Sequence, residues 1–73
     1  MNLLRTIQKI LVRRKIRRII EDHLSGKKFK RFSQKRRHVR RNLSLFCYSF
    51  LKQSGTRVAK KEVRYVARQM LQA

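Results

Sequence analysis

The sequence predicts an all-α protein built from three helices. Its 73 residues contain no proline and only two glycines, so little in the chain opposes helix formation. Both glycines follow a serine at the end of an apolar, periodic stretch, where glycine commonly ends a helix. A chain this short allows one small domain. Within this single domain (residues 1–73) we expect a basic amphipathic helix at 1–24, a basic loop at 25–32, a central helix at 33–54 and a C-terminal helix at 59–72.

The apolar stripe of the first helix changes sides near Val12. Leu3, Leu4, Ile7, Ile10 and Leu11 share one face, and Val12, Ile16, Ile19, Ile20 and Leu24 share the opposite one. Either the helix breaks near Arg13 and Arg14, or one long helix contacts different neighbours with its two halves. Under both interpretations Arg13, Arg14, Arg17 and Arg18 are mostly left for solvent or phosphate.

The central and C-terminal helices each have one apolar face, because their apolar residues recur at helical spacing. We expect this face, which packs in the core or against a partner, to include Val39, Leu43, Phe46, Phe50, Leu51, Val63, Val66 and Met70. Ser33 is the candidate N-cap of the central helix. A short chain with a net charge of +19 has difficulty standing alone, so a protein partner is expected to complete the core.

Charge is the strongest functional signal in the sequence. There are 22 lysines and arginines against three acids, and residues 25–42 hold nine bases and no acid. Such a cluster is typical of a surface that binds phosphate. The candidate phosphate-binding residues in this block are Lys27, Lys28, Lys30, Arg31, Lys35, Arg36, Arg37, Arg40 and Arg41. Phe29 and Phe32, within the same block, either pack in the core or stack on unpaired bases, and we expect core packing for both.

Several function classes lack the residues they need. One cysteine cannot form a multi-cysteine zinc site, and three acids leave little for carboxylate catalysis. We find no nucleophile–base pair and no glycine-rich loop for phosphates, and no apolar run reaches the length of a membrane span. The sequence therefore predicts a protein that is not an enzyme, with no catalytic residues, no metal, no cofactor and no membrane span.

Residues 56–71 carry the pattern Thr-Arg-Val-Ala-Lys-Lys-Glu-Val-Arg-Tyr-Val-Ala-Arg-Gln-Met-Leu. This run resembles the second loop and third helix of histone-fold proteins, with Val58 as the apolar loop residue and Glu62 and Val63 at the start of the helix pattern. Residues 29–33 look like the basic first loop that opens the long central helix of that family. The resemblance implies half of a heterodimer whose loops contact duplex phosphates. The contacting residues would be Lys30, Arg31, Thr56 and Arg57.

Two functional hypotheses remain open. One is a histone-fold-like DNA-binding subunit of a larger complex, in the nucleus or on chromatin. The alternative is a small ribosomal protein that binds rRNA, expected in the ribosome or the mitochondrion. The alternative rests on the high charge and on an acid-free, amphipathic first 20 residues, which also describes a mitochondrial targeting helix. A membrane-surface helix ranks third, because it leaves the two later helices without a role.

Overall fold

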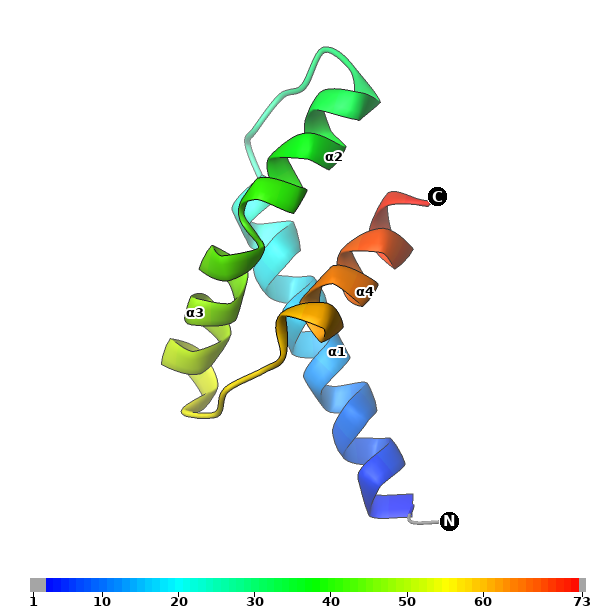
Figure 1. Cartoon of the computed structure of the whole chain (residues 1–73), viewed down its shortest axis with the longest axis vertical. Helices are drawn as coiled ribbons and strands as arrows, with labels where there is room; N and C mark the ends of the chain where they lie inside the picture. Colours follow the sequence, from blue (N-terminus) through cyan, green and yellow to red (C-terminus); the bar gives the residue numbers. More distant parts are fainter. Residues whose placement is uncertain (1–2, 73) are drawn as a thin grey trace.

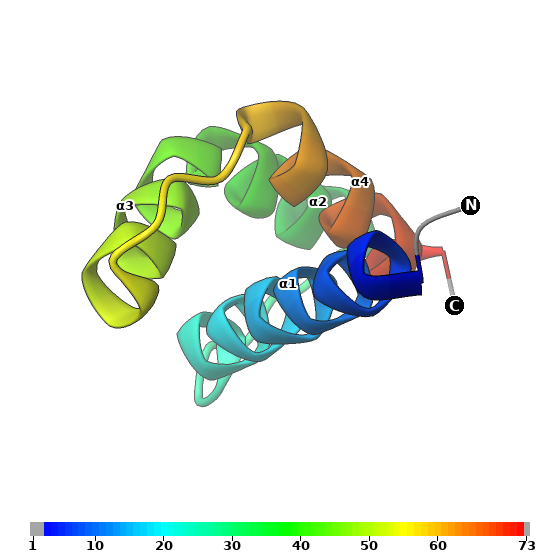
Figure 2. The ribbon, with the colours of Figure 1, turned by 90° about the horizontal axis from the view of Figure 1, so that it is seen from below.

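The computed structural model describes residues 3–72, and this part of the chain is all-helical with four helices rather than the predicted three. The helices are α1 (Leu3–Leu24), α2 (Phe32–Arg41), α3 (Leu43–Ser54) and α4 (Lys60–Leu71). Residues 1 and 2 of the predicted first helix, and residue 73, lie outside the described residues. Helix α1 packs against α3 and α4, and α4 also contacts α2 and α3. Figure 2 shows α1 lying along one side of an arch formed by the other three helices.

Helix α1 is continuous, so the change of apolar side near Val12 reflects two environments and not a break. Its second half packs into the core, where Ile16, Ile19 and Ile20 are buried. Its first half projects beyond the other helices (Figure 1). The apolar side chains of that half are more than half exposed to solvent: Leu4, Ile7, Ile10 and Leu11.

The predicted single central helix over 33–54 is wrong, because the chain divides into α2 and α3 at Asn42. The Asn42 side chain donates a hydrogen bond from Nδ2 to the carbonyl of His38 at 2.7 Å. Its backbone N–H donates to the carbonyl of Val39, three residues back, at 3.1 Å. Asparagine offers the backbone such local alternatives to the α-helical pattern. Val39 and Leu43 on either side of the break are both buried, so the apolar periodicity passes through it unchanged.

The start of α2 also differs from the prediction. The helix begins at Phe32, and Arg31 occupies the N-cap position with no hydrogen bond from its side chain. Ser33 therefore lies inside the first turn, and its predicted role as N-cap is wrong. Helix α4 begins after Ala59, which likewise provides no side-chain cap.

Both glycines lie where helices end. Gly26 follows the last residues of α1 with φ of +81°, and Gly55 is the C-cap of α3 with φ of +74°. The N–H of Gly55 donates to the carbonyl of Leu51 at 2.8 Å, which satisfies one of the free carbonyls at the helix end. The left-handed backbone at these positions favours glycine because it lacks a Cβ atom.

The core lies between α1 and the arch. Most of the predicted apolar face is buried there, while Leu51 and Met70 are half-buried at its edge. The buried residues are Ile16, Ile19, Ile20, Val39, Leu43, Phe46, Phe50, Val63, Val66 and Ala67. Among the residues that the structure describes, no helix is both long and apolar enough to cross a membrane.

Candidate nucleic-acid interface

The basic block forms the loop between α1 and α2 and most of the surface of α2. Of its nine lysines and arginines, eight are exposed and Lys35 is half-buried. Only Val39 of α2 is buried, so the helix presents charge around most of its circumference. The exposed bases of the block are Lys27, Lys28, Lys30, Arg31, Arg36, Arg37, Arg40 and Arg41.

Both ion pairs of the described residues involve an arginine of α1. Arg13 Nε donates to Glu62 Oε1 at 2.6 Å, and Arg17 Nε donates to Glu21 Oε1 at 3.1 Å. No base of residues 25–42 forms an ion pair within the described residues 3–72. The positive charge of the loop and of α2 is therefore not offset by carboxylate pairs in the folded chain.

Two of the four predicted phosphate-binding arginines of α1 are thus engaged inside the protein. The hydrogen bond to Glu62 raises the pKa of Arg13, and the guanidinium also lies 4.3 Å from the centre of the Tyr65 ring. This contact joins α1 to α4. Arg17 is paired within its own helix. Arg14 and Arg18 are exposed and have no ion pair in the described part of the chain.

The two phenylalanines of the basic block lie in different environments. Phe29 is half-buried, and its ring centre is 5.4 Å from that of His38. Phe32 is 53% exposed, so the expectation that it packs in the core is wrong. Its position in the first turn of α2 explains the difference, because that turn extends beyond the part of the helix that covers the core (Figure 1). An exposed aromatic ring among bases is available for stacking.

A histidine pair holds α1 against α2 beneath the basic loop. The Nε2 atoms of His23 and His38 are 2.9 Å apart, and the two rings are stacked with centres 5.1 Å apart. The edge of the pair meets Phe46 of α3, also at 5.1 Å. Burial lowers the pKa of His23, and the charges of Lys27 and His38 lower it further. One bond between the rings requires at least one neutral imidazole, which the lowered pKa favours.

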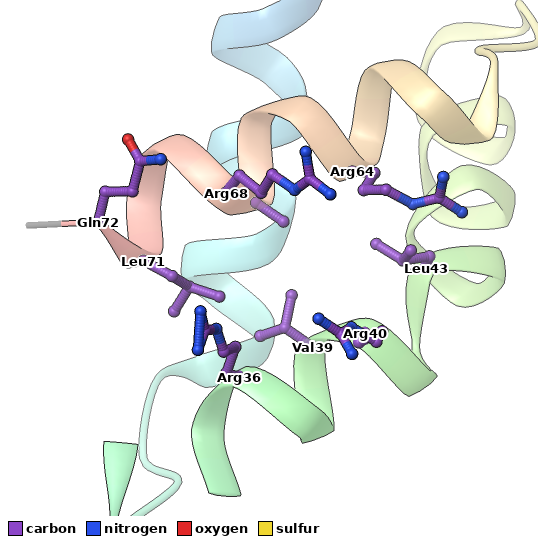
Figure 3. Close-up of a pocket in the computed structure, with 9 residues that line it drawn as sticks. Arg36, Val39, Arg40, Leu43, Arg64, Arg68, Leu71 and Gln72 are labelled. Carbon is purple, nitrogen blue, oxygen red and sulfur yellow. The ribbon is translucent and has the colours of Figure 1, made fainter. Parts of the chain in front are cut away.

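A hollow of about 400 Å³ lies between α2 and α4 (Figure 3). Two arginines from each helix line it: Arg36 and Arg40 from α2, and Arg64 and Arg68 from α4. Apolar side chains form its floor: Val39, Leu43, Ala67 and Leu71. Arg36 and Arg40 are phosphate-binding candidates from the sequence, whereas sequence reasoning missed Arg64 and Arg68. The sequence did contain a signal for them. Arg64 and Arg68 are four residues apart on one helix, and no acid lies three or four positions from either one to pair with it.

The structure does not bring all predicted phosphate-binding residues together. Thr56 and Arg57 are exposed in the loop between α3 and α4. That loop and the basic loop before α2 lie at opposite ends of the molecule (Figure 1). The two loops of one chain therefore do not form one continuous phosphate-binding surface.

Residues 3–72 contain no group of three or more histidine, cysteine, aspartate or glutamate side chains that could hold a metal ion. Cys47 is half-buried at the edge of the core. No protein-family model, no curated protein and no solved structure matches this chain.

Proposed function

We propose that this chain is a non-enzymatic nucleic-acid-binding protein that contacts phosphate backbones through the loop before α2 and through α2 itself. One observation carries the proposal: eight exposed bases lie in this region, and none has a carboxylate partner within residues 3–72. Concentrated charge of one sign repels itself, and a polyanion relieves this repulsion while releasing its own counterions.

The distribution of apolar surface supports nucleic acid over a membrane surface as the polyanion. A helix that lies on a membrane needs its bases and its exposed apolar side chains on the same element. Here the densest charge belongs to the loop before α2 and to α2, where Val39 is buried in the core and Phe32 is the exposed apolar side chain. Most of the exposed aliphatic side chains belong to the first half of α1, at the other end of the molecule from the basic loop (Figure 1): Leu4, Ile7, Ile10 and Leu11.

The first candidate within this function is a histone-fold-like DNA-binding subunit of a larger complex, in the nucleus or on chromatin. The resemblance of residues 56–71 supports it, as does the exposed apolar half of α1, which a protein partner would cover. The resemblance implies half of a heterodimer whose first and second loops contact duplex phosphates. In this chain Lys30 and Arg31 of the first loop, and Thr56 and Arg57 of the second, would contact the duplex.

The second candidate is a small ribosomal protein, in the ribosome or the mitochondrion, that binds structured RNA. Two observations favour it. Phe32 is exposed beside the bases of α2, where an unpaired base can stack on it. The break at Asn42 divides the long central helix that the histone-fold resemblance implies. Proteins that recognise RNA commonly use loops and unstacked bases rather than the duplex alone.

Salt-dependent binding tests the proposal. The affinity of the full chain for labelled duplex DNA and for a labelled RNA stem-loop is measured by fluorescence anisotropy over a range of salt concentrations. We expect affinity for duplex DNA to fall with a log–log slope of about −0.9 per phosphate bound. Higher affinity for the stem-loop would favour the ribosomal candidate. Absence of binding to both nucleic acids at low salt would overturn the proposal.

A pair of charge-matched variants tests the location of the surface. One variant replaces four bases of the loop before α2 with glutamine: Lys27, Lys28, Lys30 and Arg31. The control replaces four exposed bases elsewhere: Arg5, Lys9, Lys60 and Lys61. The loop variant should bind more weakly, and its salt slope should be shallower by about one for each phosphate that it no longer binds. Equal effects of the two variants would show that diffuse charge, and not this surface, binds the nucleic acid.

A further inference from the structure

We infer that the hollow between α2 and α4 binds an unpaired nucleotide, with the base over the apolar floor and the flanking phosphates between the arginines. The inference rests on the proposed function and names the part of a nucleic acid that this site selects. The hollow is lined by Arg36 and Arg40 on one side and by Arg64 and Arg68 on the other (Figure 3).

The charge of the lining residues favours an anionic ligand at this place. Four arginines from two helices line one hollow, and none forms an ion pair within residues 3–72. Like charges gathered at a partly apolar surface repel more strongly than they do in bulk water. Arginine binds phosphate through two parallel hydrogen bonds, so the hollow is suited to phosphate oxygens.

The geometry of the arginines suits more than one phosphate. On each helix the two arginines are four residues apart, which corresponds to about 6 Å along the helix axis. Figure 3 shows Arg64 and Arg68 along α4 on one side of the hollow, and Arg36 and Arg40 along α2 on the other. A strand that passes between the helices can therefore place successive phosphates against successive arginines.

The floor of the hollow distinguishes a nucleotide from a simple anion. The half-buried Leu71 supplies more of the accessible apolar surface of the hollow than Val39, Leu43 and Ala67, which are at most 5% exposed and lie beneath it. Inorganic phosphate would leave this surface unused. A flat base can lie over it and can also stack against the plane of a guanidinium group. The volume of about 400 Å³ lies within the range of roughly 300–1,000 Å³ that small-molecule sites occupy.

The surface beside the hollow extends the proposed site for a nucleic-acid single strand. Phe32, Arg36 and Arg40 follow one another at intervals of four residues, so they lie along one side of α2. The exposed ring of Phe32 is therefore one turn away from Arg36 and can stack on a neighbouring base. In a duplex the bases are stacked inside, so its phosphates can reach the arginines but its bases cannot reach the floor or Phe32.

A comparison of the affinities for single strands and for duplex DNA tests this inference. Affinities of the full chain are measured by fluorescence anisotropy for a short labelled single-stranded RNA, the single-stranded DNA of the same sequence, and the matching duplex DNA. The test variant is Arg64→Ala with Arg68→Ala. The control is Lys60→Ala with Lys61→Ala, which removes the same charge from the same helix outside the hollow.

The test variant should lose about tenfold more affinity for single strands than the control does, and both variants should lose similar affinity for the duplex. A larger loss for RNA than for DNA would assign the site to RNA, and equal losses would assign it to either kind of single strand. Equal effects of the two variants on every probe would overturn the inference and leave the proposed function intact. Absence of binding by the unsubstituted chain would overturn both.

A charge-conserving variant separates the geometry of the arginines from their charge. Arg64→Lys with Arg68→Lys keeps the net charge but removes the planar group that stacks and forms paired hydrogen bonds. We expect it to weaken single-strand binding and to leave duplex binding near the unsubstituted value. Circular dichroism checks that the variants fold, which we expect because both arginines are exposed. Full single-strand affinity in the lysine variant would contradict a site built for a base.

Discussion

Replacement of Phe46 by alanine tests how the helices pack around the core. The side chain is 1% exposed on α3, and its ring meets His23 of α1 edge to face with centres 5.1 Å apart. Removal of a buried phenylalanine ring costs about 3–5 kcal/mol, because apolar packing disappears and a cavity remains. A chain of 73 residues is expected to have a free energy of unfolding of about 4–11 kcal/mol. The substitution therefore removes a large share of the total stability.

The assay is urea unfolding followed by circular dichroism, in the absence of nucleic acid. Phe32→Ala is the matched control, because the same ring is removed from a side chain that is 53% exposed. Its cost should stay within about 0.5 kcal/mol. If Phe46→Ala is unfolded without urea, Phe46→Leu supplies an intermediate midpoint. Equal midpoints for the alanine variants at positions 46 and 32 would refute the packing of α3 against α1.

Three other perturbations have predicted effects on the urea midpoint of unfolding. Because burial lowers the pKa of His23 below 6.5, the unfolded chain binds the proton more tightly. Urea midpoints should therefore fall as pH decreases from about 6.5, and His23→Gln should flatten this profile. Glu62→Gln should lower the midpoint, because glutamine keeps an oxygen acceptor but lacks the negative charge that pairs with Arg13 and joins α1 to α4. Glu21→Gln, which breaks a more exposed pair within α1, should leave the midpoint unchanged, and equal effects would contradict a bracing role for Glu62. Gly55→Ala should cost about 1–2 kcal/mol through backbone strain, because φ is +74° and no atom beyond the adjacent residues lies within 4 Å of the added Cβ. An unchanged midpoint would rule out the left-handed cap.

The sequence was sufficient for the all-helical class and for the helix ends that glycine marks. Gly26 and Gly55 identify those ends because few other residues accept a positive φ. The break at Asn42 was not predictable from apolar spacing, since the buried face of α2 continues into α3 across it. Only the tendency of asparagine to bond with the nearby backbone hinted at the break. The sequence also did not predict that α1 is continuous. An apolar stripe that changes sides is expected both for a broken helix and for one helix whose halves have different neighbours.

The basic block of the candidate site was readable from the sequence, because nine bases without an acid have few partners in any fold of this chain. The hollow between α2 and α4 could not be predicted from the sequence. Arg36 and Arg64 are far apart in sequence, and they line one hollow only after α4 packs against α2. The exposure of Phe32 also depends on tertiary structure, because a ring in the first turn of a helix is buried only if a neighbour reaches it.

The projecting half of α1 has a practical consequence for handling the purified protein. Leu4, Ile7, Ile10 and Leu11 expose apolar surface that favours self-association, while the net charge of +19 keeps separate copies apart. That repulsion reaches about 10 Å in 0.1 M salt but only about 3 Å in 1 M salt. Concentrated salt washes that strip bound nucleic acid from the protein should therefore also promote its aggregation, and mild salt with a competing polyanion is the gentler route to a dispersed sample.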